Sequence, residues 1–398
     1  GEAAPAVEYW SRAAEAALGR FAILEAAQHA RAGLEALQTL EPSAETLQAE
    51  LRLQTTLGPA LMAAKGYADA EVSAVYSRAR ELCDVLGNPP AVFPVLFGLW
   101  TFHCVRALHP QALQLAEQLV TQAAAADSAE LRTEAHMVRG ITKYFQGKFR
   151  AAERDFETAW ENYDAGEFRT HILRYGQDPG MVIRSYQSWN AWMLGEVDAA
   201  DRYSDQAMQC ARRTDHPFSI AYGLTFAAWH ALNRARAAQA AQMLAEAIAL
   251  CREQKLQVFL ALALALDALR RIGGGELAAG FAAMQEALAV FTATGAELFL
   301  PAWQGVMAQA VFAQGDAAQA RKLLLDAIAR SERTEERWCL PELKRVRALL
   351  SAAGGDAADA RASLTQAGEL AQAQGAAAWL ARIAETQAQF AHAARTGR

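Results

Sequence analysis

The sequence predicts an all-α protein, built as a solenoid of about nine helix pairs with a terminal capping helix. Three observations lead to this prediction. The strong helix formers Ala, Leu, Gln, Glu and Arg dominate the 398 residues, and only 11 residues are Pro. Hydrophobic residues make up 53% of the chain, yet mean hydropathy is only −0.02, because many of them are Ala. Small and bulky residues recur at helical spacing with a period of 40 (240 − 200 and 280 − 240), whereas runs of strand type are few.

The repeated frame consists of a small, a bulky and a small residue at positions i, i+4 and i+7, which share one face of a helix. Because a single helix pair cannot bury its apolar face, the pairs must stack on one another. We therefore expect one solenoid domain over residues 1–398, although length alone would suggest two or three domains. Its capping helix is expected at about 377–393. The copies of the frame begin at Ala26, Val72, Ala112, Ala152, Ala200, Ala240, Gly280, Ala320 and Ala360.

A turn signal precedes most copies of the frame. Glycine ends a helix readily, because it accepts the left-handed conformation beyond the last helical residue. In the two units that lack such a glycine, His109 with Pro110 and Asn233 are expected to take this role. Each unit therefore consists of helix A, a tight turn, helix B and a short link. The glycines are Gly19, Gly66, Gly147, Gly195, Gly275, Gly315 and Gly355.

One link between units is longer than the others. The step of the frame from Ala152 to Ala200 is 48 instead of 40, so eight extra residues (48 − 40) fall in an irregular insertion at about 164–180. Asp178 suits an N-cap, and Pro179 suits the first turn of a helix, where its missing N–H is not needed. The end of the insertion is therefore expected to start the next helix.

The rest of the insertion divides into a spacer and a candidate site. Residues 164–171 are expected to be a spacer. No comparable structural role explains Arg174 and Tyr175. Surface loops also carry function more often than the scaffold beneath them. We therefore predict Arg174, Tyr175 and Gln177 as ligand- or partner-binding residues. The alternative is that the insertion is a structural plug of the groove.

The sequence carries no signature of catalysis, metal binding or cofactor binding. Residues 140–148 do not have the spacing of a phosphate-binding loop, and 273–275 lacks the continuation of a dinucleotide-binding motif. Zinc-type spacings of Cys and His are absent, and no nucleophile elbow occurs. We therefore expect a protein that is not an enzyme and that has no cofactor and no metal.

Charge and cysteine usage exclude further classes of partner. The net charge is −6 with both signs interspersed, which argues against direct nucleic-acid binding and against a membrane-surface segment. The most apolar run, 259–266, is far shorter than the ~20 residues of a membrane span. The five cysteines are scattered without a CxxC pair, which is typical of small buried side chains in a reducing cytoplasm.

One unit resembles a known repeat. Residues 140–159, GITKYFQGKFRAAERDFETA, resemble a tetratricopeptide repeat, with its Gly, aromatic, Gly, aromatic, Ala, aromatic and Ala in order. The stretches 51–87 and 174–180 (RYGQDPG) resemble the C-terminal repeat region of bacterial multidomain STAND (AAA-type) ATPase regulators, either cyclase-linked or LuxR/MalT-like. This resemblance implies a right-handed superhelix whose A helices line the concave surface. It also implies that ATPase, cyclase or DNA-binding domains precede the repeats.

Bulky aromatic residues fall at equivalent positions of the A helices. Trp189 and Trp229 lie one step of the frame apart (229 − 189 = 40), and Trp192 matches Tyr144 across the insertion. Trp rarely buries fully and is a favoured anchor of binding surfaces. We therefore predict Tyr144, Trp189, Trp192, Trp229 and the adjacent His230 as binding residues. The alternative is that both aromatic rows belong to the core.

These observations favour a non-catalytic sensor or scaffold region of a signalling protein. It would bind a protein, a peptide or an effector in the concave groove and control attached domains by shifting a conformational equilibrium. The alternative is a small-molecule sensor. A Trp-lined pocket with convergent polar groups would favour the sensor, and an open, shallow groove would favour the scaffold.

Overall fold

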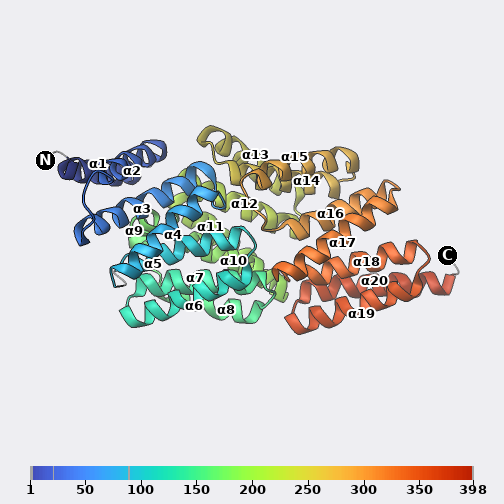
Figure 1. Ribbon diagram of the computed structural model, residues 1–398. Helices are drawn as coiled ribbons and strands as arrows, with labels where there is room; N and C mark the ends of the chain where they lie inside the picture. Colours follow the sequence, from blue (N-terminus) through green and yellow to red (C-terminus); the bar gives the residue numbers. More distant parts are fainter. Residues whose placement is uncertain (1–2, 21, 88–89, 397–398) are drawn as a thin grey trace.

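The computed structural model describes residues 3–20, 22–87 and 90–396. They form twenty α-helices and one 3₁₀ helix, with no strand among them, which confirms the all-α prediction (Figure 1). All helices except α9 and α20 form nine consecutive A–B pairs. The pairs are α1 (Ala3–Gly19) with α2 (Ile23–Leu37), α3 (Ala44–Lys65) with α4 (Ala70–Val85), α5 (Val92–Val105) with α6 (His109–Ala126), α7 (Ala129–Phe145) with α8 (Phe149–Asn162), α10 (Pro179–Leu194) with α11 (Val197–Arg213), α12 (Pro217–Asn233) with α13 (Ala237–Gln254), α14 (Gln257–Gly273) with α15 (Leu277–Ala293), α16 (Leu300–Ala313) with α17 (Ala317–Thr334), and α18 (Leu340–Ala353) with α19 (Ala357–Gln374).

The remaining helices are the insertion and the C-terminal cap. The 3₁₀ helix η1 (Ala165–Glu167) and helix α9 (Phe168–Tyr175) lie between the fourth and fifth pairs. Helix α20 (Ala377–Thr396) follows the last pair and packs on α18, α19 and α10.

The repeated frame of small and bulky residues is the buried face of the B helices. Ala240, Leu244 and Ala247 on α13 are each at most 1% exposed. The small residues are needed because helix B lies very close to helix A. A Cβ added at Gly280 of α15 would lie 2.7 Å from Cγ1 of Ile272 on α14, well inside van der Waals contact. The frame therefore recurs once for each close contact between a helix A and its helix B.

The turns between A and B helices repeat a left-handed residue at one position of the unit. Where glycine is missing, Ala107 (φ 54°) and Ala235 (φ 56°) take the left-handed conformation. The prediction for His109 with Pro110 and for Asn233 was therefore wrong: the first two residues begin α6, and Asn233 is the last residue of α12. The helix packing on either side fixes the turn, even where the residue is unfavourable. The glycines at this position are Gly147, Gly195, Gly275, Gly315 and Gly355.

This conformation gives a first testable prediction. A left-handed alanine costs roughly 1–2 kcal/mol, whereas glycine also raises the entropy of the unfolded chain. Since Ala235 is exposed, Ala235→Gly is expected to raise the free energy of unfolding by about 0.5–1 kcal/mol in urea titration. Ala245→Gly, at an exposed position inside α13, is the control and should lower it by a similar amount. A loss of stability in Ala235→Gly would contradict the assignment.

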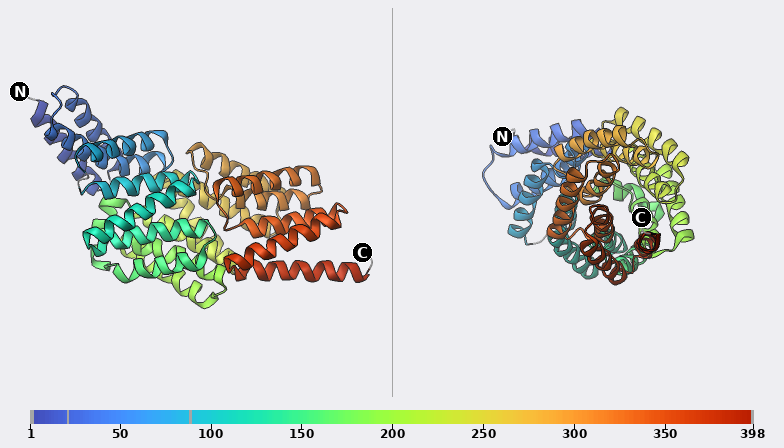
Figure 2. Two further views of the ribbon diagram at one scale, coloured as in Figure 1. Left: turned by 60° about the horizontal axis from the view of Figure 1, so that its bottom comes forward. Right: turned by 90° about the vertical axis from the view of Figure 1, so that its right-hand side faces the viewer.

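Five helix pairs make one turn of the superhelix, and successive turns touch. The carbonyl oxygen of Val105, at the end of α5, accepts a hydrogen bond from the N–H of Glu297 (2.9 Å), just before α16. One pair further on, the carbonyl oxygen of Phe145 accepts from the N–H of Arg337 (2.8 Å), just before α18. Both links therefore join positions with the same separation along the chain (297 − 105 = 337 − 145). The end-on view in Figure 2 shows the helices arranged in a ring about the long axis.

Because only five pairs make one superhelical turn, the A helices lie close together. Their aromatic side chains therefore fill the middle of the concave surface. Trp189 and Phe226 stack with ring centroids 4.0 Å apart and an interplanar angle of 4°. Phe299, just before α16, lies 6.0 Å from the same indole. The centre of the concave surface is therefore hydrophobic core, and cavities lie beside it.

Candidate functional site

The insertion is largely helical and is anchored to the scaffold. Asp178 caps α10 as predicted, since its carboxylate accepts a hydrogen bond from the N–H of Gly180 (3.1 Å). The hydroxyl of Tyr163 donates to the same carboxylate (2.7 Å), and Arg213 donates to the Tyr163 oxygen (2.6 Å). The stretch 164–171, expected to be a spacer, instead contains η1 and the first half of α9.

A buried polar contact explains why α9 forms. Nδ1 of His171 lies 2.6 Å from a carboxylate oxygen of Glu134 on α7, and both side chains are almost completely buried. Burial is the largest single effect and would lower the pKa of His171, but the hydrogen bond to Glu134 and the negative charges of Glu134, Glu130 and Asp178 together outweigh it and raise the pKa above its usual value. Burial in turn raises the pKa of Glu134. Residue 171 is therefore a structural anchor of the insertion.

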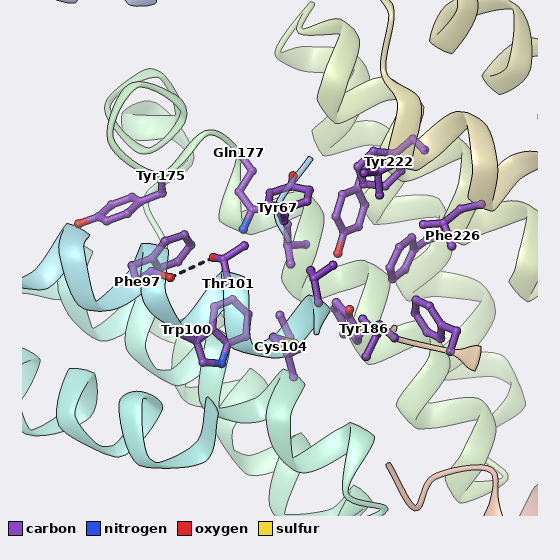
Figure 3. A pocket seen from close by; sticks show the side chains of 18 of the residues that line it. Tyr67, Phe97, Trp100, Thr101, Cys104, Tyr175, Gln177, Tyr186, Tyr222 and Phe226 are labelled. Atoms are coloured by element: carbon purple, nitrogen blue, oxygen red, sulfur yellow. Dashed lines mark hydrogen bonds between the residues drawn. The ribbon is translucent and has the colours of Figure 1, made fainter. Parts of the chain in front are cut away.

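The structure places the three predicted insertion residues in different surroundings. Arg174 is exposed and forms an ion pair with Glu130 (2.8 Å). Tyr175 is 4% exposed, and its ring lies 4.9 Å from that of Phe97. Gln177 points toward a small pocket of 90 Å³ under the insertion (Figure 3). This pocket, the α9 pocket, is lined by Tyr175 and Gln177 together with Tyr67, Phe97, Trp100, Thr101, Cys104, Val105, Ile141, Val182, Tyr186, Tyr222, Phe226, Val258, Phe259, Leu262, Phe291, Leu298 and Phe299.

The position of Arg174 gives a second prediction. Exposed ion pairs contribute little, because water and salt screen them. Arg174→Ala is therefore expected to change the free energy of unfolding by less than about 0.5 kcal/mol in urea titration. His171→Ala is the contrasting variant, because it leaves the buried Glu134 carboxylate without its partner and should lower stability by about 2 kcal/mol or more. If Arg174→Ala unfolds instead, the outer face of α9 is needed for the fold, and the insertion is a structural plug of the groove.

A larger cavity of 630 Å³ lies inside the superhelical turn formed by the fifth to ninth pairs, and we call it the tryptophan cavity. It is lined by the C-terminal ends of α7, α10, α12 and α14, by the starts of α13, α18 and α20, and by residues 302–309 of α16. Six of the nine tryptophans of the chain line it: Trp189, Trp192, Trp229, Trp303, Trp338 and Trp379. The other lining residues that enter the argument below are Tyr144, Arg270, Glu342 and Arg382.

The structure brings together four of the aromatic residues predicted from the sequence. Tyr144, Trp189, Trp192 and Trp229 all line the tryptophan cavity. Trp192 is the most accessible of them, with its ring edge-on to Trp379 at 5.6 Å. The other three are also core residues, since each is less than 10% exposed. Neither alternative of the sequence analysis is therefore excluded for them, because they support the fold and form the cavity wall.

His230 belongs to neither the tryptophan cavity nor the α9 pocket. Its Nε2 lies 2.6 Å from a carboxylate oxygen of Asp201 on α11. Consecutive helical residues point about 100° apart, so His230 faces the neighbouring B helix while Trp229 faces the axis. Burial lowers the pKa of His230 despite its contact with Asp201. His230 therefore links its own helix pair to the preceding one.

Of the six indole N–H groups of the cavity wall, three donate a hydrogen bond to another described residue, and that of Trp303 is buried without an acceptor. Trp189 donates to the carbonyl of Phe226 (3.2 Å), Trp338 to the Glu336 carboxylate (3.0 Å) and Trp379 to the carbonyl of Trp338 (2.8 Å). The indole nitrogen of Trp303, which is 1% exposed, has no partner among the described residues. A buried donor without an acceptor is uncommon and costs free energy, so it is a candidate contact for a ligand.

Two negative findings bound the chemistry of the described residues. No group of three or more His, Cys, Asp or Glu side chains among them is arranged to hold a metal ion. No helix in the described part of the chain is long and apolar enough to cross a membrane.

Comparison with known proteins rests on structure. No protein-family model matches the chain, and no curated protein matches it. The structure of a Rap protein complexed with competence and sporulation factor is similar over 97% of this chain and 99% of that chain, with a TM-score of 0.66 and 10% identity. The Cut9–Hcn1 hetero-tetramer of the APC/C is similar over 89% of this chain and 62% of that chain, with a TM-score of 0.51 and 14% identity. The chain has a tetratricopeptide-like repeat fold.

A third likeness concerns the family expected from the sequence. A STAND protein with a tetratricopeptide repeat sensor from Pyrococcus horikoshii aligns over 89% of this chain and 61% of that chain, with a TM-score of 0.42 and 13% identity. This likeness is too distant to identify a family. At 10–14% identity, the Rap protein and Cut9–Hcn1 structures show the tetratricopeptide-like fold alone.

Proposed function

We propose that this chain is a non-catalytic sensor region that binds a small ligand with an apolar body in the tryptophan cavity. The cavity carries the proposal. Its 630 Å³ falls within the ~300–1,000 Å³ of small-molecule sites, and its wall is aromatic with few polar groups, as in such sites. The unpartnered N–H of Trp303 supplies a fixed polar contact. The filled centre of the concave surface argues against the alternative of an open groove for a macromolecular partner.

The position of the cavity suggests how binding would be transmitted. One side of the cavity comes from the ends of α10, α12 and α14, and the other from α16, α18 and α20. A ligand in contact with both sides favours the conformations in which these helices lie at the separation that fits it. Binding would therefore shift the population of superhelical conformations, and attached domains would sense this change.

We further propose that these attached domains are those of a bacterial multidomain regulator acting in the cytoplasm. The stretches 51–87 and 174–180 support this assignment through their resemblance to the repeat regions of STAND ATPase regulators. All five cysteines are buried and unbridged, in keeping with a reducing compartment. The Rap protein with a similar fold was solved with competence and sporulation factor, which supports a recognition role for the present chain.

The proposal predicts saturable binding of an uncharged aromatic probe, 2-naphthylacetamide, in isothermal titration calorimetry. Trp192→Ala should weaken this binding about tenfold or more, because Trp192 is a partly exposed wall residue of the cavity. Trp10→Ala is the matched control, since Trp10 is also partly buried but lies on α1, far outside the cavity lining, and it should leave binding unchanged. Absence of saturable binding, or equal loss in both variants, would reject the tryptophan cavity as the site.

A further inference from the structure

We infer that the tryptophan cavity selects an anionic ligand: a small organic acid with an aromatic or aliphatic body. This inference rests on the proposed function and names the chemical class of its ligand. Two guanidinium groups, those of Arg270 and Arg382, and only one carboxylate, that of Glu342, are found among the described residues that line the cavity. The aromatic wall would contact the apolar body of the ligand, and the excess of guanidinium groups favours a negative charge on it.

The one carboxylate of the cavity lining is already shared between two arginines. Glu342 accepts hydrogen bonds from Arg345 (2.7 Å for each of two contacts) and forms an ion pair with Arg382 (3.0 Å). Arg382 is still 45% exposed, and with Glu342 also held by Arg345, its guanidinium keeps donors for a further acceptor.

A carboxylate outside the lining, that of Asp267, is shared between two arginines in the same way. Asp267 lies 2.8 Å from both Arg270 and Arg271. Four guanidinium groups thus share two carboxylates, and a further negative charge that acts on this set is that of Glu385, which is exposed on α20. The electrostatic potential at this end of the cavity is therefore positive, which attracts an anion and repels a cation.

The helix dipoles do not reverse this sign. The ends of α7, α10, α12 and α14 present the negative ends of their dipoles to the cavity, and α13, α16, α18 and α20 present their N-terminal, positive ends. Because four helices contribute on each side, the two effects oppose one another. The charged side chains then decide the preference.

An aromatic cage could in principle favour a cation instead. Rings such as those of Trp229 and Trp303, 5.0 Å apart, attract ammonium groups through their electron-rich faces. An ammonium ligand would, however, meet the excess of arginines and could not accept the N–H of Trp303. A carboxylate ligand satisfies both conditions, since it carries negative charge and has acceptor oxygens only.

A series of three naphthyl compounds tests the sign of the charge at constant ring size. We expect 2-naphthylacetate to bind more tightly than 2-naphthylacetamide by about fivefold or more at low salt, and 2-(2-naphthyl)ethylammonium to bind most weakly. The preference for the acetate should shrink in about 0.5 M NaCl, because salt screens exposed charges such as Arg382. Arg382→Ala should remove most of the preference while leaving acetamide binding within about twofold. Arg212→Ala, which removes a similarly exposed arginine paired with Glu246 on α13, should leave the preference intact.

The outcomes separate this inference from the proposed function. Equal binding of all three compounds, or tightest binding of the ammonium, overturns the anionic ligand and leaves the tryptophan cavity as a binding site. Binding of none of them overturns the proposed function itself. The tripeptide Ala-Ala-Trp with a free or an amidated C-terminus distinguishes the source of the anion. The cavity would select a peptide C-terminus instead of a small organic acid if the free tripeptide bound more tightly than the amidated one while 2-naphthylacetate bound no more tightly than 2-naphthylacetamide.

Discussion

Replacing Trp229 with alanine is expected to lower the free energy of unfolding by about 3–5 kcal/mol, the usual cost of truncating a large buried side chain. The indole is 9% exposed and packs against aromatic rings from three other helix pairs. Its ring centroid is 4.6 Å from that of Trp189, 5.2 Å from that of Phe299 and 5.8 Å from that of Trp338. Truncation would remove all of these contacts and enlarge a cavity that already exists beside them.

Urea titration followed by circular dichroism measures this loss. Trp192→Ala serves as the control, because Trp192 is only partly buried and should lose clearly less stability than Trp229. A loss in Trp229→Ala of under about 1 kcal/mol, well below the range for a buried aromatic residue, would mean that the indole is held loosely. Its role would then be that of a binding anchor rather than a core residue.

The helices and their pairing could be predicted from the sequence because they depend on local spacing. Close contact between helices A and B allows only small residues at fixed positions, so the contact leaves a regular period in the sequence. Even the insertion was located by the longer step of that period between Ala152 and Ala200. Its helices could not be placed from the sequence, since the burial of His171 against Glu134 depends on a partner that is distant along the chain.

The candidate site could be predicted only in part. Equivalent spacing placed Trp189 and Trp229 on one face, and both line the cavity. The opposite wall, which includes Trp303 and Trp338, was missed. Which helix ends face each other across one turn depends on the small rotation between successive pairs, and no local pattern encodes the sum of five such rotations. Phe299 and Trp379 do occupy equivalent positions two steps of the frame apart, which was the available signal for an aromatic row at the helix starts.

Replacing Glu336 with alanine is expected to destabilise the contact between the two turns by about 3–5 kcal/mol, because it removes a fully buried carboxylate from its hydrogen-bonded donors. One oxygen of Glu336 accepts from the backbone N–H of Phe299 (3.0 Å) and from the indole N–H of Trp338 (3.0 Å). The other oxygen lies 3.8 Å from Nε2 of His109, whose side chain is also fully buried. The carboxylate thus joins the start of α6, in one turn, to the segments preceding α16 and α18 in the next.

Glu336→Gln separates hydrogen bonding from charge in this contact. Its amide oxygen can still accept from Phe299 and Trp338, so the loss in urea titration should be markedly smaller than for alanine. In the alanine variant, two buried donors would have no acceptor, and each would contribute about 1–3 kcal/mol to the loss. Hydrogen exchange should also show a less protected amide at Phe299 in Glu336→Ala than in Glu336→Gln. Equal stability and equal exchange in both variants would contradict this assignment, and the turns would then be held together by aromatic packing alone.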